Sequence, residues 1–395
     1  MSKKIKILAV TGIRSEYDII YPVLDVLRQD PAFDVRLVVG GAHLSAWHQN
    51  SLSLIEQDGF LIADKIDYLL MTDRVTQRVK GVGILTSALA QTVEREQPDV
   101  LFVVGDREES IAMAIVGNYM NVLTAHLAGG DTVFGNADDP IRFATSKLVH
   151  IHFPFSQRSA DNLERVGEEA FRIFNVGNPA LDRIRMTPQR TLREVSDALH
   201  FDISDGNYVA LINHPLSSEC AEAGKQAEVI LAALEQFCIG SNYKVVAIYP
   251  NTDPGAYTIV EVLQRYEGKS FIRCYRNLER EVFVNLMRHA KALVGNSSMG
   301  ILEAPFYKLP VVNVGNRQKG REQAGNVEFV PYEVGVITQA IHKACTDEEY
   351  RKKVAEVENL FGNGRTSEKI KDVIGSIDIN DKKWIIKKNL AGPTL

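Results

Sequence analysis

Residues 5–14 read IKILAVTGIR, an apolar run followed by a glycine and an arginine. The run at 5–10 is short, mostly apolar and followed by Gly12, as expected for a strand buried on both faces of a parallel sheet. Apolar residues at 19, 20, 23, 24 and 27 then recur with helical spacing. The stretch therefore predicts a strand, a turn and a helix at the start of an α/β domain.

The same alternation continues along the chain in two series. The first predicts strands at 35–39, 100–104 and 122–126 and helices at 79–92 and 110–118. The second predicts strands at 208–212, 245–249, 271–274, 292–295 and 311–314 and helices at 227–237 and 256–266. Strands alternating with helices are typical of parallel sheets wound in right-handed crossovers, so we expect two Rossmann-like, doubly wound domains.

The expected boundary lies at the turn VGNP, residues 176–179. We place the N-terminal domain at 1–178, the C-terminal domain at 179–375 and a tail at 376–395, with the last helix a candidate to cross back to the first domain. The length of 395 residues fits two or three domains.

Composition excludes several classes of protein. With 45 Lys and Arg against 50 Asp and Glu, the net charge of −5 argues against a broadly basic nucleic-acid binder, although a local cationic phosphate pocket stays open. The four cysteines have no CxxC spacing and the histidines and aspartates have no metal-ligand spacing, so neither a disulfide framework nor a metal site is expected. The first apolar run is too short for a signal peptide or a membrane span, which predicts a cytoplasmic protein with no membrane partner.

Ligands of doubly wound sheets bind outside the carboxyl ends of the strands, which directs attention to the residues after each strand. Arg14 follows the first strand and could pair with a phosphate or lie on the surface. Asp106 follows the strand at 100–104, where it could be an acid or base, or a helix N-cap. Asp131, Asp138 and Asp139 follow the next strand, and carboxylates held together supply an acid and a base because their pKa values separate.

The second series ends in other polar groups. His214 follows the strand at 208–212, as a structural donor or as a group that meets a phosphate or a reacting proton. The loop GNSSMGILE, residues 295–303, offers Ser297, Ser298 and backbone N–H groups to an anion, and Glu303 to a ribose diol. No P-loop is present and no GxGxxG follows the first strand, which disfavours an ATPase and a nicotinamide dehydrogenase.

Taken together, these motifs resemble the hydrolysing UDP-N-acetylglucosamine 2-epimerase family of sialic- and legionaminic-acid biosynthesis. The matching segments, in order, are TGIRSEYD (11–18), GDREE (105–109), HLAGGD (126–131), ADDPIRFATSKLVHIHF (137–153), VGNPALD (176–182), NHP (213–215), GNSSMGILEAP (295–305) and NVGNRQKGR (313–321). The resemblance implies an α/β fold of GT-B type, with two Rossmann-like domains and an active-site cleft between them. It also implies a UDP-sugar substrate, no cofactor and a homodimer.

Site residues follow from the same resemblance. It implies catalytic roles for Asp106, Asp131, Asp138, Asp139 and His214, and substrate contacts for Arg14, Arg107, Arg142, Ser297, Ser298, Gly300, Glu303, Arg317 and Arg321. One departure stands out: many members of the family carry a catalytic glutamate where this chain has Ala128. Either Asp131 takes over that role, or the substrate or chemistry differs; alternatively, Asp131 only caps the following turn.

The implied reaction breaks the bond between the anomeric carbon and UDP, passes through a glycal by loss of the C2 proton, and adds water to give UDP and the C2-inverted sugar. The expected substrate is UDP-N-acetylglucosamine or UDP-2,4-diacetamido-2,4,6-trideoxyglucose. The alternatives are a non-hydrolysing epimerase, which usually reads GDT and HVEAG where this chain reads GDR and HLAGG, a GT-B glycosyltransferase, and a catalytically silent nucleotide-sugar-binding protein.

Overall fold

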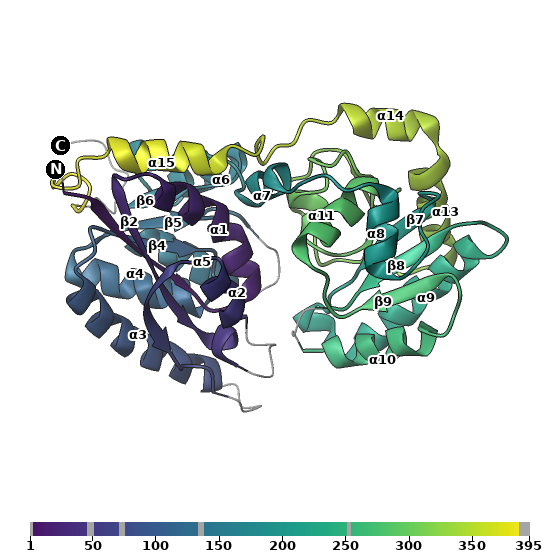
Figure 1. The fold of residues 1–395 in the computed structure, drawn as a ribbon, viewed down its shortest axis with the longest axis horizontal. Coiled ribbons are helices and arrows are strands. Elements are labelled where there is room, and N and C mark those ends of the chain that lie inside the picture. The colour runs from purple at the N-terminus through teal and green to yellow at the C-terminus, as the bar shows by residue number, and fades with distance from the viewer. Residues whose placement is uncertain (1–2, 46–50, 71–75, 133–137, 251–253, 387–395) are drawn as a thin grey trace. The chain divides into compact units, whose positions relative to one another are not determined.

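The computed structural model describes residues 3–45, 51–70, 76–132, 138–250 and 254–386. The chain divides into two compact units (Figure 1). Unit 1 contains the described residues up to Thr132, from Asp138 to Arg183 and from Phe361 onward, and unit 2 contains Ile184–Leu360. The chain passes from unit 1 to unit 2 within helix α7 (Ala180–Met186).

Unit 1 is built on a six-stranded parallel sheet in the order β3-β2-β1-β4-β5-β6. Its strands are β1 (Ile5–Thr11), β2 (Phe33–Gly40), β3 (Leu61–Ile66), β4 (Val100–Val104), β5 (Leu123–Leu127) and β6 (Ile151–Phe153). Its helices are α1 (Arg14–Gln29), α2 (Leu52–Gln57), α3 (Thr76–Glu96), α4 (Glu108–Met120), α5 (Asp138–Leu148), α6 (Gln157–Arg165) and α15 (Thr366–Ser376), with short 3-10 turns at Gly41–Leu44 and Ala170–Arg172. Helices α3 and α4 pack on one face of the sheet, and α1 and α15 pack together on the other (Figure 1).

Unit 2 repeats the plan. Its sheet is also parallel and has the order β12-β11-β10-β7-β8-β9. The strands are β7 (Tyr208–Ile212), β8 (Lys244–Ile248), β9 (Ile272–Tyr275), β10 (Leu293–Gly295), β11 (Val311–Val314) and β12 (Val327–Val330). The helices are α8 (Leu192–Leu199), α9 (Ala223–Cys238), α10 (Ala256–Tyr266), α11 (Arg280–His289), α12 (Met299–Leu302), α13 (Val334–Thr346) and α14 (Glu348–Glu356), with a 3-10 segment at Ser217–Glu222.

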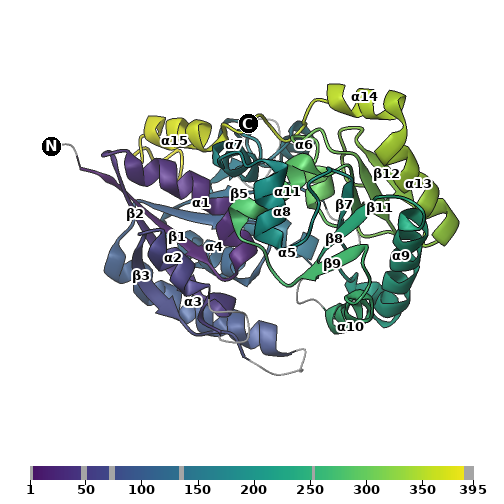
Figure 2. The ribbon, with the colours of Figure 1, turned by 45° about the vertical axis from the view of Figure 1, so that its right-hand side comes forward.

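Strand β7 shows why its sequence is continuously apolar. Val209 and Leu211 pack into the layer of α9, α10 and α13, whereas Tyr208, Ala210 and Ile212 pack into the layer of α8 and α11 (Figure 2). Because helices cover both faces, all five residues are buried, and the polar group among their side chains, the Tyr208 hydroxyl, donates to the Leu286 carbonyl at 2.6 Å. The continuous apolar runs of the sequence therefore mark the central strands.

Both sheets share the strand order 3-2-1-4-5-6, counted from the first strand of each unit. In this order, successive strands of unit 1 are added first on one side of β1 and then, from β4, on its other side. In unit 2 the same switch occurs between β7 and β10. In doubly wound sheets, the loops after such strand pairs diverge to opposite faces, and ligands bind between them. The fold therefore directs attention to the loops after residues 11, 104, 212 and 295.

Unit 1 is completed by the segment that returns to it from unit 2. Asp182 in α7 accepts hydrogen bonds from the backbone N–H groups of Thr366 (2.9 Å) and Ser367 (2.6 Å), at the first turn of α15. The fully buried Arg172 donates to the carbonyl groups of Lys383 (2.6 Å) and Trp384 (2.7 Å). A buried carboxylate and a buried guanidinium thus hold the returning segment at two points.

We expect Asp182→Ala to lower the free energy of unfolding by about 1–3 kcal/mol, because two buried backbone donors at the start of α15 lose their acceptor. Denaturant titration followed by circular dichroism measures the change. Asp372→Ala, which removes an exposed carboxylate of the same helix, is the matched control and should change stability by less than about 0.5 kcal/mol. Equal stabilities for the two variants would contradict the anchoring role of Asp182.

Candidate active site

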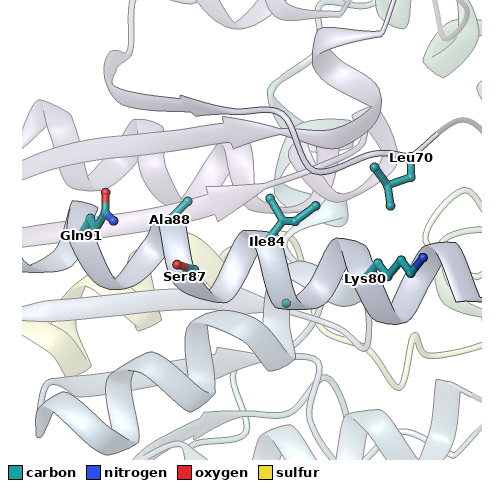
Figure 3. A pocket seen from close by; sticks show the side chains of 7 residues that line it. Leu70, Lys80, Ile84, Ser87, Ala88 and Gln91 are labelled. Carbon is teal, nitrogen blue, oxygen red and sulfur yellow. The ribbon is translucent and has the colours of Figure 1, made fainter.

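The polar residues predicted for the site lie at strand ends and not in the surface hollow along α3. A shallow hollow runs along α3 and is lined mainly by small and apolar residues (Figure 3). Its lining residues are Leu70, Lys80, Gly83, Ile84, Ser87, Ala88 and Gln91. None of these residues lies in a loop that directly follows β1, β4, β7 or β10, and none is a carboxylate or a histidine. The candidate site is therefore built from the loops after the central strands.

In unit 1 a single guanidinium collects the groups at the ends of β4 and β5. Arg142 from α5 donates through Nη2 to the carboxylate of Asp106, and through Nη1 to the carbonyl of Ala128 at 3.0 Å. The same Nη1 lies 3.7 Å from Oδ2 of Asp131. Two of the four carboxylates predicted to act in catalysis, Asp106 and Asp131, are thus brought to one cation, whose side chain is only 9% exposed.

Charge balance explains why Arg142 is tolerated in a buried position. The pKa of this guanidinium is raised, because the nearby carboxylates of Asp106, Asp131 and Asp139 outweigh the opposing effect of burial. Asp139 therefore belongs to the same electrostatic cluster. The side chain of Asp138 lies outside the described part of the chain.

The turn that carries Ala128 has an unusual backbone. Ala128 has a φ of +65°, in the left-handed region that residues with a side chain rarely adopt. Its N–H donates to the Phe153 carbonyl at 3.0 Å, and its own carbonyl is the one held by Arg142. Nearby, His126 bonds the Gly105 carbonyl (2.7 Å) and Ser146 (3.2 Å), so this histidine ties β4 to β5. Among the described residues, no group of three or more His, Cys, Asp or Glu is arranged to hold a metal ion.

Two further carboxylates are buried at the ends of β1 and β4, and sequence reasoning missed them. Glu16 accepts a hydrogen bond from the Gly12 N–H at 3.2 Å, and Glu109 accepts one from the Tyr68 hydroxyl. Burial and the neighbouring Glu109 raise the pKa of Glu16 well above its usual value, and burial also raises the pKa of Glu109. The available signal was a glutamate in the first turn of each helix that follows a central strand, at positions 16 and 109.

The arginines predicted as substrate contacts in unit 1 already have acidic neighbours. Nε of Arg14 lies 3.8 Å from Oδ2 of Asp18. Nη2 of Arg107 lies 3.7 Å from Glu108, and Nε lies 3.8 Å from Glu109. These separations exceed the length of a hydrogen bond, so both guanidiniums keep donor capacity for another anion.

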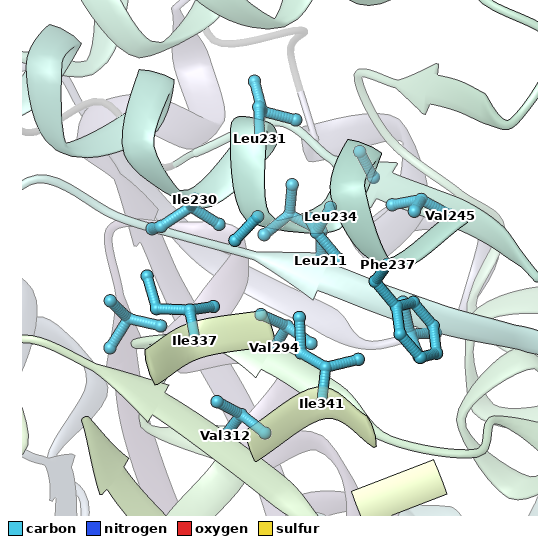
Figure 4. Packing of buried hydrophobic residues seen from close by; sticks show 14 of the residues in the cluster. Leu211, Ile230, Leu231, Leu234, Phe237, Val245, Val294, Val312, Ile337 and Ile341 are labelled. Carbon is cyan, nitrogen blue, oxygen red and sulfur yellow. The ribbon is translucent and has the colours of Figure 1, made fainter. Parts of the chain in front are cut away.

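In unit 2 the predicted residues meet around the ends of β7, β10 and β11. Leu211 and Val294 lie in neighbouring strands just before two of these ends and pack in the buried layer against α9 and α13 (Figure 4). Beyond them, the backbone N–H of His214 donates to Oδ1 of Asn296 at 2.7 Å. Nη1 of Arg317 donates to the Asn296 carbonyl at 3.1 Å. The sheet therefore places His214, the loop that carries Ser297 and Ser298 (the serine loop) and Arg317 next to one another.

The serine loop leads into the short helix α12. Ser297 Oγ accepts from the Met299 N–H at 3.4 Å, while Ser298 occupies the N-cap position. Gly300 faces inward, where an added Cβ would lie 2.9 Å from Val311. Glu303 follows α12, and burial raises its pKa to about 7, with Arg280 opposing the shift. Arg321 lies further along and donates to the Gln318 side chain at 3.0 Å.

Comparisons with known proteins identify the family. A family profile described as UDP-N-acetylglucosamine 2-epimerase matches residues 25–375. The chain belongs to the UDP-N-acetylglucosamine 2-epimerase family. It is 32% identical over 377 residues to the UDP-N,N'-diacetylbacillosamine 2-epimerase (hydrolyzing) of Legionella pneumophila, covering 95% of this chain and 97% of that protein. It is 29% identical over 392 residues to the UDP-N-acetylglucosamine 2-epimerase of Neisseria meningitidis, covering 98% and 100%.

A solved structure extends this likeness to the fold. The crystal structure of UDP-GlcNAc 2-epimerase from Neisseria meningitidis bound to UDP-GlcNAc matches with a TM-score of 0.79 at 21% identity, over 94% of this chain and 100% of that one. The predicted GT-B-type class, with two Rossmann-like doubly wound units, is thereby confirmed for this epimerase-family chain. Among the described residues, no helix has the length and apolar composition needed to cross a bilayer.

The buried glutamates give this epimerase-family chain a testable pH dependence. A carboxyl group with a raised folded-state pKa stabilises the fold fully below its unfolded pKa, about 4.5, and that contribution is lost as pH rises through the folded pKa. We therefore expect Glu109→Gln to gain stability relative to the wild type as pH rises from about 5 to about 8. Melting temperatures of both proteins across this range measure the difference.

Glu96→Gln is the control with the opposite sign. Hydrogen bonds from Lys6, with further help from Arg36, lower the pKa of Glu96, so its contribution is present above the unfolded pKa and is lost as pH falls. This variant should lose stability relative to the wild type as pH rises from about 3 to about 5, and the difference should stay nearly constant from about pH 5 to about 8. A melting-temperature difference for Glu109→Gln that does not change with pH would show that Glu109 is not a carboxyl group of raised pKa.

Proposed function

We propose that this protein is a hydrolysing 2-epimerase of a UDP-linked 2-acetamido sugar. The observation that carries the proposal is Arg142, which bonds the Asp106 carboxylate and lies 3.7 Å from Asp131. Two carboxylates fixed at adjoining strand ends provide the two proton-transfer groups that epimerisation at C2 requires. Family membership and the printed name of the Legionella relative support the hydrolysing reaction.

The chemistry has two steps. In the first, a carboxylate takes the proton from C2 as the bond from C1 to the UDP oxygen breaks, which leaves a glycal with a C1–C2 double bond and free UDP. In the second, a carboxyl group returns a proton to C2 from the opposite face while water adds to C1. The net reaction consumes one water and gives UDP and the C2-inverted free sugar.

The proposed roles follow the hydrogen bonds. Asp106 and Asp131 act on the sugar, and Arg142 holds Asp106 by a direct bond. Asp138, Asp139 and the substrate contacts Arg14 and Arg107 complete the proposed set in unit 1. In unit 2 we propose His214 for the reacting sugar or its phosphate, and Ser297, Ser298, Glu303, Arg317 and Arg321 for the nucleotide, with Gly300 at its loop.

The substrate is one of two UDP-sugars. The Legionella relative favours UDP-2,4-diacetamido-2,4,6-trideoxyglucose, and the Neisseria relative favours UDP-N-acetylglucosamine. Incubation of the protein with each sugar alone, with UDP release and the free sugar followed by chromatography, tests both. Release of UDP together with a C2-inverted free sugar is expected for one of them. Inversion with UDP still attached would instead show a non-hydrolysing epimerase. Homodimer formation and a cytoplasmic location stay predictions of the family resemblance.

We expect Asp131→Asn and Asp106→Asn each to lower kcat by at least about 100-fold, the usual scale for loss of a general acid or base. UDP affinity, measured by calorimetry, should barely change, because these carboxylates act on the sugar. Asp161→Asn, an exposed position of α6 in the same unit, is the control and should keep full turnover. If Asp131→Asn keeps near-full turnover while Asp106→Asn is inactive, Asp131 only shapes the turn and another group supplies the second proton.

We expect Glu303→Ala to weaken UDP binding by about tenfold or more, because a buried hydrogen bond to the ribose is worth about 1–3 kcal/mol. Glu261→Ala removes an exposed carboxylate of α10 in the same unit and should leave the UDP affinity unchanged. Calorimetric titration of UDP into both variants gives the comparison. Equal affinities would remove Glu303 from the nucleotide contacts.

A further inference from the structure

Asn296 makes a reciprocal pair of hydrogen bonds with a residue 82 positions away. Its Oδ1 accepts from the backbone N–H of His214 at 2.7 Å, and its Nδ2 donates to the backbone carbonyl of His214 at 2.8 Å. The Asn296 residue is 1% exposed, so neither bond competes with bulk water. A single side chain thus closes the loop after β7 onto the loop after β10.

The backbone of Asn296 holds a third loop. Its carbonyl accepts from Nη1 of Arg317 at 3.1 Å and from Nε2 of Gln318 at 3.0 Å, and both donors follow β11. Its N–H donates to the Ile212 carbonyl at 3.2 Å. The loops after the three adjacent strands β7, β10 and β11 therefore all bond to one residue.

The pairing requires an asparagine. A primary amide presents one acceptor and one donor side by side, which matches the N–H and C=O of a single residue. The close approach of the two loops is itself built in, since an added Cβ at Gly295 would lie 2.2 Å from the Ile212 carbonyl oxygen. Gly295 has a φ of +120°, a conformation that side chains rarely allow.

We propose that Asn296 is a positioning residue for the epimerase reaction, acting through His214. The inference rests on the function proposed above. The side-chain amide of Asn296 fixes the backbone of His214, and its backbone carbonyl separately fixes Arg317. Because any substitution keeps the backbone carbonyl, replacing the side chain releases His214 and leaves the nucleotide contact of Arg317 in place.

The kinetic test compares Asn296→Ala with the wild type. We expect kcat to fall by about tenfold or more while UDP affinity changes by less than about threefold. In a His214→Gln background the same substitution should cost little more, because positioning of an absent imidazole has no effect. Asn285→Ala is the matched control: Asn285 is also fully buried, bonds the Pro188 and Glu281 carbonyls, and lies in α11 away from these loops. Its effect on kcat should be small and should add to that of His214→Gln.

A second readout does not depend on turnover. Burial, with a smaller contribution from the Arg317 charge, lowers the pKa of His214 to about 3. Release of the loop in Asn296→Ala should expose the imidazole and move its pKa toward the ordinary value near 6.5, as followed by NMR of the ring protons and assigned with His214→Gln. Should the alanine variant not fold by circular dichroism, Asn296→Ser, which keeps a hydroxyl in the buried space, is expected to show the same shift.

The outcomes separate this inference from the proposed function. A wild-type protein that releases no UDP from either sugar would refute the function, while the His214 titration would still decide the positioning role. An unchanged His214 pKa in the Asn296 variant, together with kcat losses that add in the double variant, would overturn the role of Asn296.

Discussion

Parallel pairing of β1 with β4 and of β7 with β10 determines where the loops of each unit lie. Parallel strands present all their carboxyl ends at one edge, so every loop that follows a strand reaches the same side of the sheet. Reversal of the strand order at these two pairs then separates the flanking helices and leaves room between the loops. Most strand positions are covered on both faces and carry apolar side chains, so the candidate site residues lie mainly in the loops that follow the strands.

The two units use that edge differently. In unit 1 the loops present charge: Arg142 is buried and is balanced by several carboxylates. In unit 2 the neutral amide of Asn296 lies at the centre of three loops, and the guanidinium of Arg317 bonds its backbone carbonyl. A charged cluster suits proton transfer, since Arg142 fixes the position of the carboxylates that lie beside it. A hydrogen-bonded frame beside a guanidinium suits the binding of an anion, because the frame fixes the position of the positive charge.

The sequence predicted the central strands of both sheets but missed three of the four edge strands. The expected strands at 100–104, 208–212 and 311–314 agree with β4, β7 and β11, and the expected helix at 256–266 agrees with α10. Strands β3, β6 and β12 were not predicted. They lie at sheet edges, where a strand can be three residues long or partly exposed and so lacks a continuous apolar run. In the candidate site, the motifs named Asp106, Arg142 and His214, but they did not predict that Arg142 bonds Asp106 or that Asn296 bonds His214. The contact of Arg142 with Asp106 depends on how α5 packs in the folded unit, and residue spacing within a short motif does not predict this packing.

The anchoring of α15 by Asp182 has a consequence for synthesis on the ribosome. Translation proceeds from the N-terminus, so unit 1 emerges first, yet its last helix emerges only after all of unit 2 has been made. Until then the face of α1 that α15 covers is open to water, and Asp182 has no partner for either oxygen. Unit 1 of the nascent chain therefore stays incomplete during the whole synthesis of unit 2. It can reach its final fold only after the segment that begins at Phe361 has been made.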